Sequence, residues 1–327
     1  MDKTTGVSPV AQPPRRHRGT WPAVGVAVLF AAGTAVRLGG LEAGALLVPL
    51  VSFTPYFAVA SLVVLGVVIS ARNRVAIAIM LAVCLCLAAC VVPRAVGGTV
   101  SAAGRPLRVL TANLNGGRAE AQPVVDLVRR LNVDVLSLQE LTWAERDRLE
   151  AAGLAKLLPY QVVEPEMWGA DGSGLYARHP LRERTGLFQP VGHHMPVAEV
   201  ALPGGAAVEV VVVHPVAPVP STVAEWEAGV ATLPPPAATG APRILAGDFN
   251  ATVDHAVFRR LLATGYTDAA ASTGHGLAPT WSVRRVLPLV TIDHVLTDSR
   301  AGAADVHVYD VPGSDHRAVF ADLRIQP

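Results

Sequence analysis

The sequence predicts an α/β domain built on two sheets and preceded by three transmembrane helices. The first observation is composition: the 327 residues are 51% hydrophobic and only 16% charged, which is too apolar for a wholly water-soluble chain. The second is the pattern from residue 105 onward, where short apolar runs are numerous and the helical segments between them are few. This pattern favours a mixed, two-sheet sandwich over a regular βαβ succession.

Three apolar blocks precede the domain, over residues 21–36, 43–71 and 75–92. A bilayer core about 30 Å thick needs about 20 helical residues to cross it. The second block is long enough, although Pro49 and Pro55 are expected to kink it, whereas the third has 18 residues and the first has 16. The first block crosses if Arg37 snorkels to the headgroups and residues 38–41 lie within the interface. We therefore expect a membrane region over residues 21–92.

The distribution of positive charge predicts which way these helices run. Three arginines lie in the tail formed by residues 1–20, and Arg72 and Arg74 separate the second block from the third. The positive-inside rule places both groups in the cytoplasm, so three spans in the cell membrane carry everything after residue 92 outside. If the first block only lies on the membrane, two spans return the C-terminal region to the cytoplasm instead.

The three cysteines, Cys84, Cys86 and Cys90, all lie in the third apolar block. The rest of the chain therefore has no thiol to oxidise, which is compatible with a domain outside the cytoplasm. We interpret the cysteines as small helix-packing or lipid-facing residues. The alternative is a lipoprotein cleavage site at LAAC, residues 87–90, but its internal position and the apolar residues after it argue against this.

The elements of the domain follow a linker. Residues 93–104 are expected to form this linker because Gly, Ser and Ala dominate it, and one globular domain then covers residues 105–327. AQPVVDLVRRLN, residues 121–132, predicts an amphipathic helix because its Val and Leu residues share one face. Strands are expected at seven apolar runs: LRVLTANL, DVLSLQEL, GLYAR, AAVEVVVVHP, RILAGDF, TIDHVLT and RAVFADLRI.

Polar side chains stand at the ends of most of these strands. They are Asn113, Asn115, Glu140, His214, Asp248, Asn250, Asp293, His294, Asp315 and His316. Each has an ordinary explanation on its own, such as a helix cap, a solvated edge residue or a histidine that donates to a backbone carbonyl. Their joint placement favours one functional site, because loops on one rim of a sheet are where a scaffold assembles functional groups.

The segment RILAGDFNAT, residues 243–252, has two interpretations. If the strand persists, Asp248 and Asn250 point the same way and present two oxygen ligands to one spot, while Phe249 packs on the opposite face. The alternative is an Asx-type turn after a buried strand, since Gly, Asp and Asn are all turn formers.

The motifs NLNGG, LQEL, GSGLYARHPL, VVVHPVAP, LAGDFN, PTW, IDHV and GSDHRAV occur in this order. In that order they resemble the endonuclease/exonuclease/phosphatase superfamily, which includes DNase I-like nucleases, neutral sphingomyelinases and inositol-polyphosphate phosphatases. The resemblance covers residues 105–327 and none of the membrane region. It implies a four-layer α/β sandwich of two sheets, as in DNase I, and hydrolysis of a phosphoester with Mg²⁺ or Mn²⁺.

The resemblance also implies a metal site. Glu140 would be the main ligand of the ion, with Asn115 and Asn113 nearby, because hard cations take oxygen ligands. Asp315 would contact the metal or orient its own loop.

The catalytic roles implied by the resemblance belong to five residues: His214, Asp248, Asn250, Asp293 and His316. His316, oriented by Asp293, would be the general base for water, and Asp248 would position that water. Asn250 would donate to a phosphoryl oxygen, and His214 would contact the scissile phosphate. The carboxylate that partners the second histidine in some nucleases has no unambiguous match, and Glu166 and Asp171 are candidates by position.

Charge narrows the substrate class. Residues 105–327 contain 19 Lys plus Arg and 24 Asp plus Glu, a net of −5, whereas residues 1–104 contain 8 and 2, a net of +6. An acidic domain without basic clusters is poorly suited to nucleic acid, whose binding rests on phosphate neutralisation. We therefore expect a lipid-linked or small phosphoester or pyrophosphate as substrate, with Trp168 resting at the bilayer surface. The alternative for Trp168 is a partly buried aromatic residue of a loop. The alternatives are a DNase I-like nuclease and an inactive, membrane-tethered binding scaffold.

Overall fold

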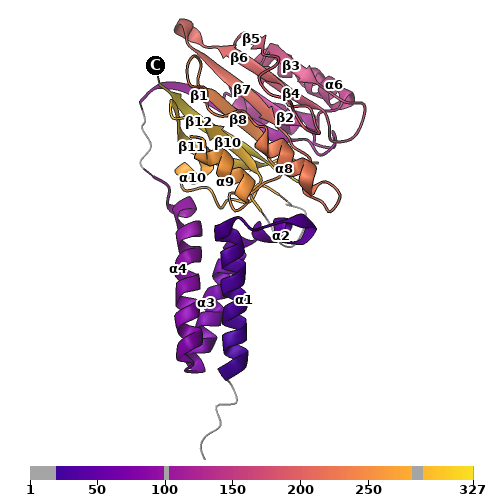
Figure 1. The fold of residues 1–327 in the computed structure, drawn as a ribbon. Helices are drawn as coiled ribbons and strands as arrows, with labels where there is room; N and C mark the ends of the chain where they lie inside the picture. Colours follow the sequence, from indigo (N-terminus) through magenta and orange to yellow (C-terminus); the bar gives the residue numbers. More distant parts are fainter. Residues whose placement is uncertain (1–19, 99–102, 282–289, 327) are drawn as a thin grey trace, which may run out of the picture.

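The computed structural model describes residues 20–98, 103–281 and 290–326, and it places a layered domain on a helical stem (Figure 1). The stem consists of α1 (Thr20–Gly39), α3 (Thr54–Ser70) and α4 (Arg74–Val96). Residues 21–39 and 74–96 form two helices that are long and apolar enough to cross a membrane. A third span results if α3 is counted together with α2 (Gly44–Val51).

The second apolar block is broken rather than kinked. α2 and α3 meet at an angle of 76° across residues 52–53. Pro55 occupies the first turn of α3, where its missing N–H costs nothing but where a preceding helix cannot continue straight through. α2 consequently lies across the base of the domain (Figure 1), where Val48 is buried among domain side chains such as Trp226.

The first apolar block is longer than predicted, because α1 continues through Arg37 to Gly39. Arg37 does not extend toward lipid headgroups. Its side chain is buried, and its Nε donates to Asp254 Oδ1 at 3.0 Å. The positive charge that ends this helix is thus paired with a carboxylate of the domain.

The connection between stem and domain is also shorter than predicted. α4 continues through Pro93 to Val96, into the segment expected to be linker. Arg94 is buried and its Nη1 donates to Asp254 Oδ2 at 2.8 Å, while its carbonyl accepts from the N–H of Gly276. The N–H of Gly98 donates to the carbonyl of Ser272. The end of α4 is therefore docked on the domain and is not a loose tether.

The domain contains two six-stranded sheets. The first has the order β11 (Ala301–Asp310), β12 (Arg317–Ile325), β1 (Arg105–Asn113), β2 (Val135–Gln139), β4 (Ser173–Ala177) and β3 (Tyr160–Glu164). The second has the order β5 (Leu181–Glu183), β6 (Val197–Ala201), β7 (Ala207–Val213), β8 (Arg243–Asp248), β10 (Asp293–Thr297) and β9 (Thr267–Asp268). Each sheet is antiparallel apart from one central parallel pair, β1 with β2 and β7 with β8.

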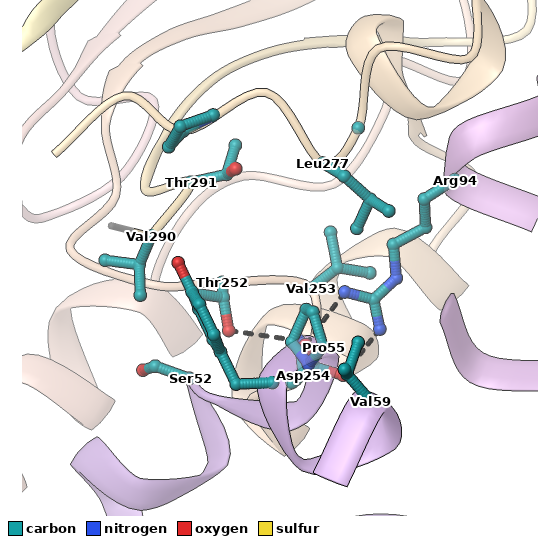
Figure 2. Close-up of a pocket in the computed structure, with 13 residues that line it drawn as sticks. Ser52, Pro55, Val59, Arg94, Thr252, Val253, Asp254, Leu277, Val290 and Thr291 are labelled. Carbon is teal, nitrogen blue, oxygen red and sulfur yellow. Dashed lines mark hydrogen bonds and ion pairs between the residues drawn. The ribbon is translucent and has the colours of Figure 1, made fainter. Parts of the chain in front are cut away.

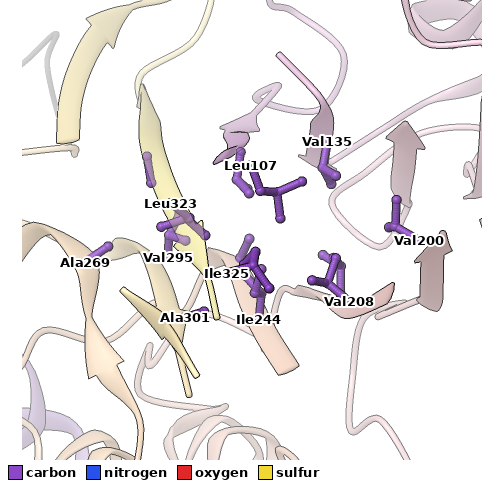
Figure 3. Packing of buried hydrophobic residues seen from close by; sticks show 14 of the residues in the cluster. Leu107, Val135, Val200, Val208, Ile244, Ala269, Val295, Ala301, Leu323 and Ile325 are labelled. Atoms are coloured by element: carbon purple, nitrogen blue, oxygen red, sulfur yellow. The ribbon is translucent and has the colours of Figure 1, made fainter. Parts of the chain in front are cut away.

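The core lies between the two sheets, where inward-facing aliphatic side chains interdigitate (Figure 3). Leu107 and Val135 come from the first sheet, and Val208, Ile244 and Val295 come from the second. Residues i and i+2 of a strand share a face, so the other face of each sheet remains to be covered.

Helices cover these outer faces and complete four layers. The first sheet is covered by α5 (Ala121–Arg130), α6 (Trp143–Ala151) and α7 (Leu154–Leu157). The second is covered by α8 (Val223–Ala231) and α9 (Ala256–Ala263), with α2 beside them. Short helices at Pro203–Gly205 (η1) and Ala269–Ser272 (α10) complete the domain. The predicted four-layer, two-sheet fold is confirmed, and the expected amphipathic helix forms as α5 with Val124, Leu127 and Val128 buried.

We expect Asp254→Ala to destabilise the full-length protein in lipid nanodiscs by about 3–5 kcal/mol, because it leaves two buried guanidinium groups without their carboxylate. Thermal unfolding would measure the loss, and trypsin should cut the domain from the stem faster. Asp310→Ala is the matched control, since this carboxylate is 80% exposed in its pair with Arg317. Equal melting temperatures for the two variants would show that the buried pairs do not hold the domain on the stem.

Candidate active site

Most of the predicted polar residues converge at one end of the two sheets. β8 and β10 pair in a register that sets Asp248 opposite Asp293. Asn113 ends β1, and Glu140 follows directly after β2. The two sheets are tied together beneath this end by the buried Ser137 hydroxyl of β2, which donates to the carbonyl of Ala246 in β8 at 2.8 Å. Residues far apart in the sequence are thereby held on one rim.

His316 is oriented by Asp293, as the sequence predicts. Its Nδ1 lies 3.0 Å and 3.2 Å from the two carboxylate oxygens of Asp293. Its backbone N–H donates to the hydroxyl of Ser314, which in turn donates to the carbonyl of Asn113. The imidazole is therefore fixed from both the ring and the backbone, and its Nε2 faces Asp248 Oδ2 at 3.8 Å.

The charges in this cluster shift one another's pKa values. Burial alone would lower the pKa of His316, but the carboxylates of Asp293 and Asp248 outweigh it and raise the pKa to about 10. Burial raises the pKa of Asp248 to about 7, and the nearby charge of Asp293 adds to the increase. Two buried carboxylates thus compete around one imidazolium.

The donor set fits a divalent cation. Asp248, Asp293 and His316 each offer a ligand atom, and these atoms lie within 4.8 Å of one another. Glu140 adds a third carboxylate beside them, hydrogen-bonded to the same Asn113 amide as Asp248. Three carboxylates against one imidazole leave an excess of negative charge, which oxygen-seeking cations such as Mg²⁺ neutralise.

Asn113 joins the carboxylates of the two sheets. Its Oδ1 accepts from the N–H of Asn115 at 2.8 Å, so its amide hydrogens face the cluster. Its Nδ2 donates to Glu140 Oε1 and to Asp248 Oδ2, each at 3.0 Å. The family resemblance implied that Asn113 and Asn115 lie near the metal through their oxygens. Here Asn113 holds the carboxylates in place instead, and the oxygen of Asn115 accepts from Arg118 at 3.1 Å.

Three residues of the site adopt left-handed backbone conformations. Asn115, Glu140 and Asn250 have φ values of 52°, 57° and 48°. Such conformations are uncommon for residues other than glycine, and they cost of order 1–3 kcal/mol each. Each of these residues lies one or two positions after the end of its strand, where the chain turns at the rim.

The GDFN segment contains both of the expected features, a strand that ends in Asp248 and an Asx turn after it. Asp248 is the last residue of β8 and Phe249 is fully buried on the opposite side. An Asx turn follows, in which the N–H of Asn250 donates to Asp248 Oδ1 at 2.8 Å. The Asn250 amide donates to the carbonyl of Pro215 at 3.0 Å. The turn occupies one carboxylate oxygen of Asp248 and leaves Oδ2 for the site.

A family model described as the endonuclease/exonuclease/phosphatase family matches residues 110–316. The chain belongs to this family. No curated protein matches it. Among solved structures, it is similar to an endonuclease/exonuclease/phosphatase from Beutenbergia cavernae, with 19% identity and a TM-score of 0.55 over 68% of this chain and 72% of that one.

Two further structures share the fold. One is an endonuclease/exonuclease/phosphatase from Bacteroides vulgatus, with 14% identity and a TM-score of 0.51 over 68% of this chain and 100% of that one. The other is a humanized D. rerio TDP2, with 15% identity and a TM-score of 0.50 over 67% and 99%. Members of the endonuclease/exonuclease/phosphatase family hydrolyse phosphoester bonds and typically use a divalent metal, which agrees with the donor set of the cluster.

His214 lies at the same rim, directly after the end of β7. Its Nε2 lies 3.9 Å from Glu140 Oε1. Burial, aided by the nearby charges of His193 and His316, holds the pKa of His214 well below its usual range. A neutral imidazole at this position can donate through one nitrogen and accept through the other.

The neighbour of His214 is a second histidine that the sequence analysis missed. His193 Nδ1 lies 3.2 Å from His214 Nδ1, and Asp171 Oδ1 lies 3.4 Å from His193 Nε2. Of the two candidate carboxylates, Asp171 therefore reaches His214 through His193, whereas Glu166 contacts His194. The only signal in the sequence was the pair of histidines in VGHHM.

Two of the remaining polar residues, Asp315 and His294, are hydrogen-bonded to groups outside the cluster. Asp315 Oδ2 accepts from the indole N–H of Trp281 at 3.3 Å, which agrees with the expectation that it orients its loop. His294 is buried away from the cluster, where its Nδ1 lies 2.7 Å from Asp268 and its Nε2 donates to the carbonyl of Ala251.

We expect His193→Ala to lower the kcat of hydrolysis of an aryl phosphodiester by about tenfold, because His214 loses the partner that sets its tautomer and orientation. His193→Asn, which keeps a hydrogen-bonding group, should recover most of this loss. His194→Ala is the control, since its ring contacts glutamates at the surface. If His193→Ala and His194→Ala had the same kcat, the role assigned to His193 would be refuted.

Proposed function

We propose that the protein is a metal-dependent phosphoesterase that acts outside the cell membrane on a lipid-linked or small phosphoester or pyrophosphate. The observation that carries this proposal is the buried group of Asp248, Asp293 and His316 with Glu140 beside it, at the ends of strands from both sheets. Hydrolysis of a phosphoester needs a positioned water, a group that accepts its proton, and stabilisation of charge on the phosphoryl oxygens. The site offers groups for each requirement.

His316 is the proposed general base in its neutral form. Despite burial, the carboxylates of Asp293 and Asp248 raise its pKa, and the positive charge of a bound divalent cation would oppose them and favour the neutral imidazole. Asp293 holds its Nδ1, which leaves Nε2 to accept a proton from water in the space between this nitrogen and Asp248 Oδ2. Asp248 positions that water with the oxygen that the Asx turn leaves available. The distance of 3.8 Å between the two atoms allows both to contact one water oxygen.

The phosphoryl oxygens face the amide and imidazole groups of the rim. Asn250 uses one amide hydrogen on Pro215 and has a second one for a phosphoryl oxygen. His214, kept in place by His193, contacts the scissile phosphate or the leaving oxygen. Mg²⁺ or Mn²⁺ would be held by Glu140, whose carboxylate is oriented by Asn113, and when bound the ion would supply a Lewis acid for the phosphoryl oxygens. The Glu140 side chain is 21% exposed and can be reached by a hydrated ion.

The attachment of the domain supports a substrate in the membrane. α4 remains helical to Val96, and its end is hydrogen-bonded to the domain. The site therefore stays close to the bilayer surface. The loop before β4 presents Met167 and Trp168, which are 65% and 79% exposed. Its Gly169 carbonyl lies beside Gly116, which also neighbours Glu140. Exposed tryptophans favour the bilayer interface.

The test compares substrates under one set of conditions. We expect the full-length protein with Mg²⁺ to hydrolyse a long-chain lipid phosphate or pyrophosphate in nanodiscs much faster than plasmid DNA at about 0.2 M salt, since an acidic domain has few counterions to release. His316→Ala should lower the lipid rate by about 10² to 10⁴. Efficient DNA cleavage with no lipid turnover would favour the nuclease alternative, and no turnover of either would favour the binding scaffold.

The proposed orientation is tested separately. α1 packs along α3 and α4 (Figure 1), an arrangement that supports three spans. With three spans, the arginines of residues 1–20 and of residues 72–74 favour an outward C-terminus. We expect alkaline phosphatase, which is active only outside the cytoplasm, to be active when fused after residue 327 and inactive when fused at Asn73. Activity at Asn73 alone would reverse the orientation and place the enzyme in the cytoplasm.

A further inference from the structure

A cavity of about 260 Å³ lies where the stem meets the domain (Figure 2). Its membrane side is formed by the elbow between α2 and α3, with Ser52, Tyr56 and Val59. Its domain side is formed by the loop after the Asx turn, with Thr252, and by the segment before β10, with Val290. The cavity therefore has one wall from the membrane helices and one from loops that belong to the active-site rim.

A second hollow, of about 400 Å³, adjoins this cavity on the membrane side. It is a groove between α1, α2 and α3, lined mostly by apolar side chains such as Val36, Leu47, Phe57 and Ala60. Tyr56 lines both the cavity and the groove, so the two are neighbours. Together they fall within the size range of ordinary ligand sites.

The boundary between groove and cavity carries excess positive charge. Arg37 lines the groove, Arg94 lines the cavity, and both bind the single carboxylate of Asp254. Arg259 and Glu42, which lie next to them, offset each other's charge. One positive charge thus remains at the polar end of an apolar groove, which is complementary to an anionic headgroup attached to a hydrocarbon chain.

The outer wall of the cavity packs against the catalytic residues. Val290 pairs with Trp281, which also pairs with His316, and the rings of Trp281 and His316 lie 6.2 Å apart. The hydroxyl of Thr280 accepts from the backbone N–H of Asp293 at 3.1 Å. A single residue, Trp281, thus lies between His316 and Val290 of the cavity wall.

We propose that groove and cavity form the lipid-binding site of the enzyme. The groove takes the hydrocarbon chain of one lipid-linked phosphoester, and the cavity takes the polar segment next to it, so that the phosphate approaches His316 from the membrane side. This inference rests on the proposed function. It adds that chain length is recognised within the stem, by residues of α1, α2 and α3, rather than by the domain alone.

The test fills the groove. Ala60→Trp places an indole in it, whereas Leu62→Trp, turned about 200° around the same helix, is the control on the lipid-facing side. Hexadecyl phosphate with a diazirine in its chain is the probe, crosslinked to full-length protein in nanodiscs and mapped by mass spectrometry. We expect crosslinks on α1 and α3 around the groove, reduced about tenfold by Ala60→Trp and retained in Leu62→Trp.

Turnover gives the second measurement. The ratio of kcat/KM for p-nitrophenyl hexadecyl phosphate to that for p-nitrophenyl ethyl phosphate should fall about tenfold in Ala60→Trp and stay unchanged in Leu62→Trp. Equal labelling and equal ratios for the two variants would overturn the site. Because crosslinking does not require catalysis, groove labelling without lipid turnover would contradict the proposed function, whereas turnover with dispersed labelling would contradict only the lipid site.

Discussion

The position of the candidate active site relative to the helical stem depends on the carboxylate of Asp254. It lies in the loop that follows the Asx turn of Asp248 and Asn250, and it binds Arg37 of α1 and Arg94 of α4. Burying an unpaired charge costs several kcal/mol of folding free energy, about 3–5 kcal/mol when one partner of a buried pair is removed. The ends of the two helices and the loop are therefore stable in these buried positions only when they come together. The strand that ends at Asp248 is thereby attached to two apolar helices of the stem through one side chain.

Within the domain, the site depends on contacts between sheets that pack mainly through aliphatic side chains. Asn113 connects Glu140 of the first sheet to Asp248 of the second, and Ser137 connects the same two strands beneath it. The left-handed residues Glu140 and Asn250 end their strands where these contacts form. Strained backbone and buried carboxylates are therefore concentrated where two halves of a hydrophobic sandwich meet.

The sequence was most informative where one physical signal dominated. The long Val-, Leu- and Ile-rich runs became β1, β7, β8 and β12, and the polar residues at their ends met as expected. Five strands were not predicted: β3, β5, β6, β9 and β11. Of these, β5 and β9 contain only three and two residues and carry almost no pattern, and a bulge interrupts β11 between Ala303 and Asp305. Arg37, Arg94 and His193 could not be assigned, because their partners are distant in the sequence and only the tertiary fold brings them together.

The pairing of β12 with β1 determines when the domain can be completed. β12 is the last strand of the chain, yet it lies between β11 and β1 in the interior of the first sheet. Until it has emerged from the ribosome, or from the translocation machinery if the domain is exported, β1 has an unpaired edge beside the helical stem. The helical stem is made first and the sheet above it is closed last. Biogenesis of this protein therefore requires a partly folded sheet to be protected beside the apolar stem while the rest of the domain is delivered.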